Sequence, residues 1–192
     1  MNKILVIIIS ILSVLGLNSC QEDSVHVNLK GKKVLIAYMS WSGNTETAAE
    51  RISEVTGGDM FKIEREEPYP EDLERCLIVS KPESQNNERP AIKGEVANFE
   101  HYDVVFIGTP VWWSTCPMPV FTFLENYNFA SKTVIPFSTS SSGKSRSHSD
   151  IERQTRNATH LDGLDLITDS TQGEDIVTQY EKINEWLRGF GY

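Results

Sequence analysis

Cysteine is scarce in this sequence of 192 residues, which has three, at positions 20, 76 and 116. No two of them form a C-x-x-C pair, and three are too few for a disulfide framework, so we expect no thiolate-bound metal and no dithiol redox motif. Cys76 and Cys116 could pair in an oxidising compartment, but the sequence sets no distance between them, and we expect independent thiols. The four histidines are scattered without the spacing of metal ligands and are expected at the surface. The sequence therefore predicts no metal site.

Basic residues are also few. The sequence has 18 Lys and Arg against 27 Asp and Glu, which gives a formal net charge of -9 and a pI near 5.0. This balance excludes general attraction to nucleic acid or to anionic lipid, and an anion bound here must be held by local groups. With 39% hydrophobic and 23% charged residues, the composition is that of one globular domain with a full core, not of a disordered or coiled-coil chain.

The first 19 residues have the pattern of a bacterial signal peptide. A short basic start is followed by an apolar run from Ile4 to Leu15, which is too short for a typical membrane span. The sequence Leu17-Asn18-Ser19-Cys20 resembles the lipobox of bacterial lipoproteins, in which cleavage leaves the cysteine as the lipidated first residue. The resemblance implies a lipid anchor at Cys20 and a place in the cell envelope, outside the cytoplasm. An ordinary secretory signal and an uncleaved hydrophobic helix are the alternatives.

Residues 20–31 are polar and lack helical periodicity, so we expect a tether there and a folded domain over residues 32–192. In this domain strand patterns alternate with helix patterns. Strands are expected at 34–38, 60–63, 104–108, 133–137 and 164–167, and helices at 45–55, 71–79, 120–124, 147–156 and 174–188.

This alternation predicts an α/β fold. The main strand runs are apolar without polar alternation, which is typical of parallel strands buried on both faces. Because crossovers between parallel strands are right-handed, five such strands separated by helices predict a doubly wound parallel sheet covered on both sides. Ligands of such sheets bind at the carboxyl ends of the strands. We therefore expect function in the loops that follow Tyr38, Thr109 and Phe137.

The first of these loops has the composition of a phosphate site without a positive charge. It joins a strand to a helix and contains no Lys or Arg, and its candidate ligand residues are Ser40, Ser42, Gly43, Asn44 and Thr45. Hydroxyls, a carboxamide and backbone N–H groups at a helix N-terminus can together replace the water around a phosphate. The loop matches neither G-x-G-x-x-G nor G-x-x-x-x-G-K-[ST]. The alternative is a polar turn whose side chains only cap the helix.

The other two loops suit a flat aromatic ligand. The second carries two indoles, and its candidate residues are Pro110, Val111, Trp112 and Trp113. A ring stacked on an indole gains ~0.5–1.5 kcal/mol beyond burial. The third offers hydroxyls and backbone groups for the polar edge of a ring, from Ser138, Thr139, Ser140, Ser141 and Gly143. The alternatives are indoles that fill the core and a flexible serine-rich loop.

Together, the S-x-S-G-N-T and P-x-W-W loops resemble those of the flavodoxin family, from about Lys33 to Leu187. The resemblance implies a flavodoxin-like sheet of order 2-1-3-4-5 and a noncovalent FMN cofactor. It implies that Ser40 and residues 42–45 hold the phosphate, that residues 110–113 line the isoalloxazine, and that residues 138–143 meet its pyrimidine edge. The third loop is richer in serine than in many relatives.

The resemblance also implies a redox protein that transfers electrons through FMN, and three versions stay open. Small size and an acidic surface favour a carrier between protein partners, whereas the Trp112-Trp113 pair favours an NAD(P)H or quinone oxidoreductase with a small quinone-like substrate. The third version is a flavin-binding lipoprotein without redox turnover. Only acidic side chains near the ring would tune its potential, because salt screens charges beyond ~8–10 Å; Asp103 and Glu125 are the candidates.

Overall fold

The computed structural model describes residues 27–143, 145–168 and 175–192. The predicted signal peptide and the predicted lipidation site at Cys20 lie outside the described residues. Among the helices of the described residues, none combines the length and the apolar character needed to cross a membrane.

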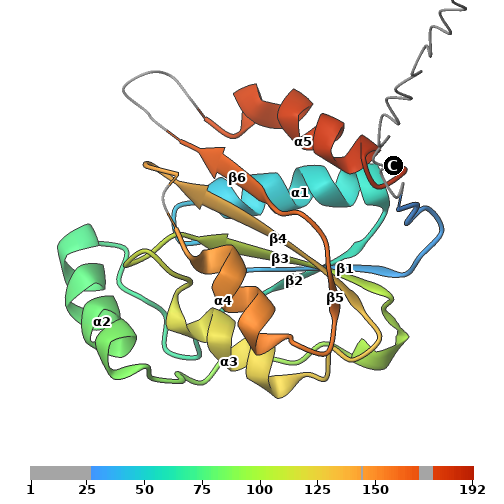
Figure 1. The fold of residues 1–192 in the computed structure, drawn as a ribbon. Coiled ribbons are helices and arrows are strands. Elements are labelled where there is room, and N and C mark those ends of the chain that lie inside the picture. The colour runs from blue at the N-terminus through green and yellow to red at the C-terminus, as the bar shows by residue number, and fades with distance from the viewer. Residues whose placement is uncertain (1–26, 144, 169–174) are drawn as a thin grey trace, which may run out of the picture.

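Strands and helices alternate along the chain, as the sequence predicts (Figure 1). The strands are β1 (Val34–Tyr38), β2 (Asp59–Lys62), β3 (Val104–Pro110), β4 (Thr133–Ser140), β5 (Thr159–His160) and β6 (Leu164–Ile167). The helices are α1 (Asn44–Thr56), α2 (Leu73–Asn86), α3 (Met118–Asn126), α4 (Ser147–Gln154) and α5 (Tyr180–Arg188), with short 3-10 turns at Phe99–His101 and Val177–Gln179.

The sheet is parallel and has the order β2-β1-β3-β4-β5, which confirms the expected order. A sixth strand is also present, because two short segments pair with β4 where one strand was expected. β5 pairs with Thr133 and Val134, and β6, the predicted fifth strand, pairs with Phe137–Ser140. The break lies beside Pro136, which has no N–H to donate to a neighbouring strand.

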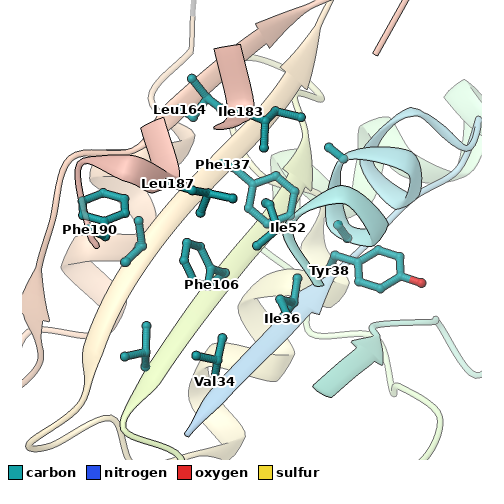
Figure 2. Close-up of a cluster of buried hydrophobic side chains, with 14 of the residues drawn as sticks. Val34, Ile36, Tyr38, Ile52, Phe106, Phe137, Leu164, Ile183, Leu187 and Phe190 are labelled. Atoms are coloured by element: carbon teal, nitrogen blue, oxygen red, sulfur yellow. The ribbon is translucent and has the colours of Figure 1, made fainter. Parts of the chain in front are cut away.

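Side chains of the central strands alternate between two apolar layers. On one face, Ile36, Phe106 and Phe137 pack with Ile52 of α1 and Leu187 of α5 (Figure 2). Successive residues of a strand point to opposite faces, so Ala37 and Ile107, which follow Ile36 and Phe106, belong to the other layer. α1 and α5 cover the first face, and α3 and α4 cover the second (Figure 1). Because the strands are parallel, their carboxyl ends lie at one common edge, where the loops that follow them meet.

Helix α2 differs from the expected helix over 71–79 in both length and position. It runs through Pro82 to Asn86, so the proline removes one backbone hydrogen bond without ending the helix. It lies at the side of the molecule where the strands end (Figure 1) and contacts α3. Its buried residues are Cys76, Ser80 and Glu83, a narrow stripe that leaves most of the helix surface exposed.

The folded body begins before residue 32. Leu29 is buried, its N–H donates to the carbonyl of Phe190 over 2.8 Å, and Val27 packs against the core. Residues 27–31, predicted as part of a polar tether, therefore contact the domain through their two apolar side chains.

Candidate functional site

The parallel sheet brings the three predicted loops to one edge. The N–H of Met39 after β1 donates to the carbonyl of Gly108 in β3 over 3.0 Å, and the N–H of Val111 after β3 donates to that of Thr139 in β4 over 2.9 Å. The hydroxyls of Thr45 and Thr139 share a hydrogen bond of 2.8 Å, which links the first loop to the third. The residues named from sequence thus lie at the ends of three adjacent strands.

The first loop leaves the start of α1 uncapped by side chains. Gly43 precedes the helix with φ 91°, in the left-handed region that glycine adopts most easily, and no side chain caps the helix by a hydrogen bond. The first N–H groups of a helix have no partner within it, so they are available to an anion. A Cβ built on Gly43 meets no atom within 4 Å, so the loop is open on this side. The capping alternative is therefore not what the structure shows.

Ser40 holds an unsatisfied hydroxyl in this loop. Its Oγ is buried and has no hydrogen-bond partner within the described part of the chain. A buried polar atom without a partner costs ~1–3 kcal/mol, and such atoms are rare in folded proteins. Ser42 is exposed, and among the described residues the Asn44 side chain has a long contact of 3.5 Å to the Thr168 hydroxyl. A phosphate would supply the partner that the Ser40 hydroxyl lacks.

The second loop is a tight hairpin from Trp112 to Thr115. The two end residues exchange backbone hydrogen bonds of 2.9 Å in both directions. Trp113 and Ser114 between them have φ of 53° and 63°. Left-handed conformations are unfavourable for residues other than glycine, and they persist where surrounding structure enforces them, often at functional sites. The sequence has no Asn-Gly signal for such a turn, so the hairpin was not predictable from it.

The two indoles of this hairpin do not fill the core. Trp112 is partly buried, with ring centroids 6.3 Å from Trp41 and 5.1 Å from Tyr69, both in edge-to-face geometry. Trp113 is 39% exposed. Trp41 and Tyr69 are aromatic members of the site that the sequence analysis did not identify. Trp41 belongs to the predicted phosphate loop, and in the structure its indole N–H donates to the carbonyl of Pro70 over 3.0 Å.

The third loop is shorter than predicted because β4 continues to Ser140. Ser138 and Thr139 are buried in the strand, where the Ser138 hydroxyl donates to Asp165 and the Thr139 hydroxyl bonds Thr45. These two hydroxyls are thus engaged within the protein. Ser141 is exposed in the loop itself, and Gly143, at φ 67°, donates its N–H to Ser140 Oγ over 2.8 Å.

An ion pair near the phosphate loop compensates the nearest acidic group. Glu46 lies in the first turn of α1, and Lys62 of β2 contacts its carboxylate at 2.9 Å. Burial opposes ionisation of Glu46, but hydrogen bonds from Lys62 and from the Tyr38 hydroxyl outweigh it and lower its pKa. Burial, and then the hydrogen bond to Glu46, raise the pKa of Tyr38. The carboxylate therefore has a positive neighbour beside a loop suited to an anion.

A family model described as flavodoxin matches residues 33–183. The chain belongs to the flavodoxin family. A comparison with curated proteins gives no match.

Similar solved structures support this family assignment. A protein of Bacteroides eggerthii DSM 20697 assigned as a flavoprotein is 33% identical, with a TM-score of 0.70 over 84% of this chain and 99% of that one. One from Bacteroides uniformis ATCC 8492 is 30% identical, with a TM-score of 0.70 over 83% and 99%. A flavoprotein of Lactobacillus acidophilus NCFM in complex with FMN has the same fold, at 24% identity and a TM-score of 0.61 over 80% and 99%.

Membership in the flavodoxin family supports FMN as the cofactor. The residues present fit its phosphate, since an uncapped helix start and an unsatisfied Ser40 hydroxyl meet in one loop.

The two acidic residues proposed from sequence to tune a flavin make their contacts outside the three loops. Asp103 immediately precedes β3, at the amino edge of the sheet, and accepts a hydrogen bond of 2.9 Å from the N–H of Lys33. Glu125 lies near the end of α3 and pairs with Arg89 at 2.7 Å. The place of Asp103 follows from the predicted strand at 104–108, because a residue that precedes a parallel strand lies at the amino edge and the ligand loops lie at the carboxyl edge.

Other predictions about reactive side chains can be compared with the described residues. Cys76 and Cys116 are both free and buried, as expected for independent thiols. In the described part of the chain, no group of three or more His, Cys, Asp and Glu is placed to hold a metal ion. His148 is an exception to the expected surface histidines: its side chain is 23% exposed, and burial lowers its pKa.

Proposed function

We propose that this flavodoxin binds FMN noncovalently at the carboxyl edge of its sheet and transfers electrons through it. The observation that carries the proposal is the first loop, in which the buried Ser40 hydroxyl lacks a partner and the N-terminus of α1 lacks a side-chain cap. A phosphate would supply an acceptor for the first N–H groups of α1 and a partner for the Ser40 hydroxyl. Bound FMN supplies the redox chemistry, so the protein needs to orient it, exclude water and set the local charge.

Each loop has its own part in this proposal. Ser40, Ser42, Asn44 and the first N–H groups of α1 would hold the phosphate, and Thr45 fixes the loop against β4 through Thr139. The Trp112–Thr115 hairpin would cover the ring, because its indoles lie at the sheet edge and not in the core. Backbone and hydroxyl groups from 140 to 143 remain for the polar edge of the ring.

We further propose that Cys20 carries the lipid anchor and that the domain works in the cell envelope. The support is the Leu17-Asn18-Ser19-Cys20 motif after a signal-peptide pattern. The redox partner is then another protein or a small quinone-like compound. Turnover of NAD(P)H with a quinone by the FMN-loaded protein would indicate an oxidoreductase, and its absence would indicate a carrier.

The binding proposal is tested with a matched pair of charge changes. Asn44→Asp places a carboxylate at the start of α1, where the helix dipole favours a negative charge, so the fold should remain stable. The same change at Asn128, an exposed residue following α3, is the control. Unit charges 4 Å apart repel by roughly 4 kcal/mol at an effective dielectric constant of about 20, and half of that is about 30-fold in affinity.

Quenching of flavin fluorescence during titration measures the affinity. We expect saturable binding to the unchanged protein and to Asn128→Asp, and binding at least ~30-fold weaker for Asn44→Asp. A protein that binds no FMN at micromolar concentration contradicts the proposal. Equal affinities for the two variants would place the phosphate elsewhere.

A further inference from the structure

A separate cavity lies between the Trp112–Thr115 hairpin and α2. It has a volume of about 210 Å³, and its walls include Val111 and Trp112 on one side and Leu73 and Leu77 of α2 on the other. Among the described residues that line it, none comes from β4 or from the loop after it. The hairpin contacts that loop through the carbonyl of Ser114, which accepts from the N–H of Arg146 over 3.0 Å. The cavity is therefore on the α2 side of the hairpin, and the serine-rich loop is on the other.

The cavity lining is apolar and aromatic. Among the described residues that line it, none is charged. Their side-chain hydrogen-bonding groups are the Ser80 hydroxyl, the Cys76 thiol and the indole N–H groups of Trp113 and Trp41. The Trp41 N–H already donates to the carbonyl of Pro70. Trp113 and Ser80 contact each other over 3.4 Å, a long hydrogen bond that a ligand acceptor could replace. Lys81 is outside the lining, with its Nζ 5.6 Å from the centre of the Trp113 ring. Within the cavity, a charged ligand would lose its hydration without gaining a charged partner among the described lining residues.

The walls are held in place although they expose apolar surface. Leu73 and Leu77 are 57% and 42% exposed, respectively, and Trp113 is 39% exposed. Glu83 fixes α2 by an ion pair of 3.0 Å with Arg65 and by a hydrogen bond from the Tyr69 hydroxyl. The opposite wall is the hairpin whose two central residues have positive φ. A strained, aromatic wall facing an anchored apolar wall is typical of a ligand site.

We propose that this cavity binds a flat, uncharged molecule of one or two fused rings with a hydrogen-bond acceptor on its edge. Drug-sized ligands occupy pockets of roughly 300–1,000 Å³, so a smaller ring suits this one. The ring lies between Trp112 and Leu77, and its acceptor meets the Trp113 indole N–H. The inference that this molecule is a substrate of the redox site rests on the proposed function, whereas its binding to the cavity does not.

The test uses two probes that share a naphthalene ring and do not react with thiols. 2-Naphthol is neutral at pH 7, and naphthalene-2-sulfonate carries a charge. Each is titrated into the full chain, with and without saturating FMN, while the indole N–H signal of Trp113 is followed by nuclear magnetic resonance. Leu77→Asp places a charge in the cavity wall, and Ile78→Asp makes the same change at the next residue of α2, which is 72% exposed and outside the lining.

We expect saturable binding of 2-naphthol with and without FMN, at least tenfold weaker binding of the sulfonate, and at least a tenfold loss in Leu77→Asp with less than a twofold change in Ile78→Asp. The proposal is overturned if neither probe binds, if the charged probe binds as well as the neutral one, or if both variants behave alike. It is also overturned if FMN displaces the probe, because the cavity would then belong to the flavin site. Separate FMN titration keeps these outcomes distinct from failure of the proposed function.

Discussion

Replacing Ser40 by alanine tests the phosphate loop with two measurements that should change in opposite directions. Without FMN, the buried Ser40 Oγ has no partner, and its removal takes away a desolvation penalty of ~1–3 kcal/mol. The FMN-free protein should therefore become more stable. In a chain of 192 residues, 1 kcal/mol corresponds to about 2–4 °C in melting temperature, so a rise of a few degrees is expected.

With FMN, the same change removes a donor to a charged phosphate. Such a hydrogen bond contributes ~1.5–3 kcal/mol, which is about 10- to 150-fold in affinity. The added stability that saturating ligand confers on the fold should shrink accordingly. Thermal unfolding followed by circular dichroism measures the first effect, and fluorescence titration with FMN measures the second.

Ser42→Ala is the control for this experiment. Ser42 is an exposed residue of the same loop, so its replacement should leave the FMN-free stability within ~0.5 kcal/mol. If Ser40→Ala lowers the stability of the FMN-free protein, the hydroxyl has a structural partner and the argument fails. If it leaves the affinity for FMN unchanged, Ser40 does not contact the phosphate.

Two further predictions concern stability. Burial lowers the pKa of His148 from 6.5, against the effect of neighbouring carboxylates, so the folded state favours the neutral ring. The free energy of unfolding should therefore fall as the pH drops below 6.5. Urea titrations from pH 5 to 8 measure this dependence, which His148→Gln should flatten. A Cβ on Gly108 would lie 2.2 Å from Cζ of Phe137, so Gly108→Ala should lower the free energy of unfolding by ~1–3 kcal/mol. Adding Phe137→Leu should restore part of this loss. A melting temperature that does not recover in the double variant would contradict this packing argument.

Much of the fold could be predicted from local patterns. The apolar runs at 34–38 and 104–108 are strands because residues buried on both faces need no polar alternation, and the helices between them force a parallel sheet. Once the strands are parallel, their carboxyl ends share an edge. The meeting of the first two loops therefore follows from sequence alone.

Other features depend on contacts between distant segments. The sequence pattern predicts a helix that ends before Pro82. Helix α2 continues past it because the ion pair of Glu83 with Arg65 and the burial of Ser80 stabilise its second half. Ser138 and Thr139 belong to β4 because β6 pairs beside them, which a serine-rich composition does not reveal.

By itself, the sequence determined the order of strands and helices and the donor chemistry of the first loop, since hydrophobic period and residue type are local properties. The tertiary structure alone decided which donors lack partners, how the hairpin turns at Trp113 and Ser114, and where α2 leaves a cavity. Burial, satisfaction of hydrogen bonds and backbone strain depend on neighbours that are remote in the chain, so these features appear only when the chain is folded.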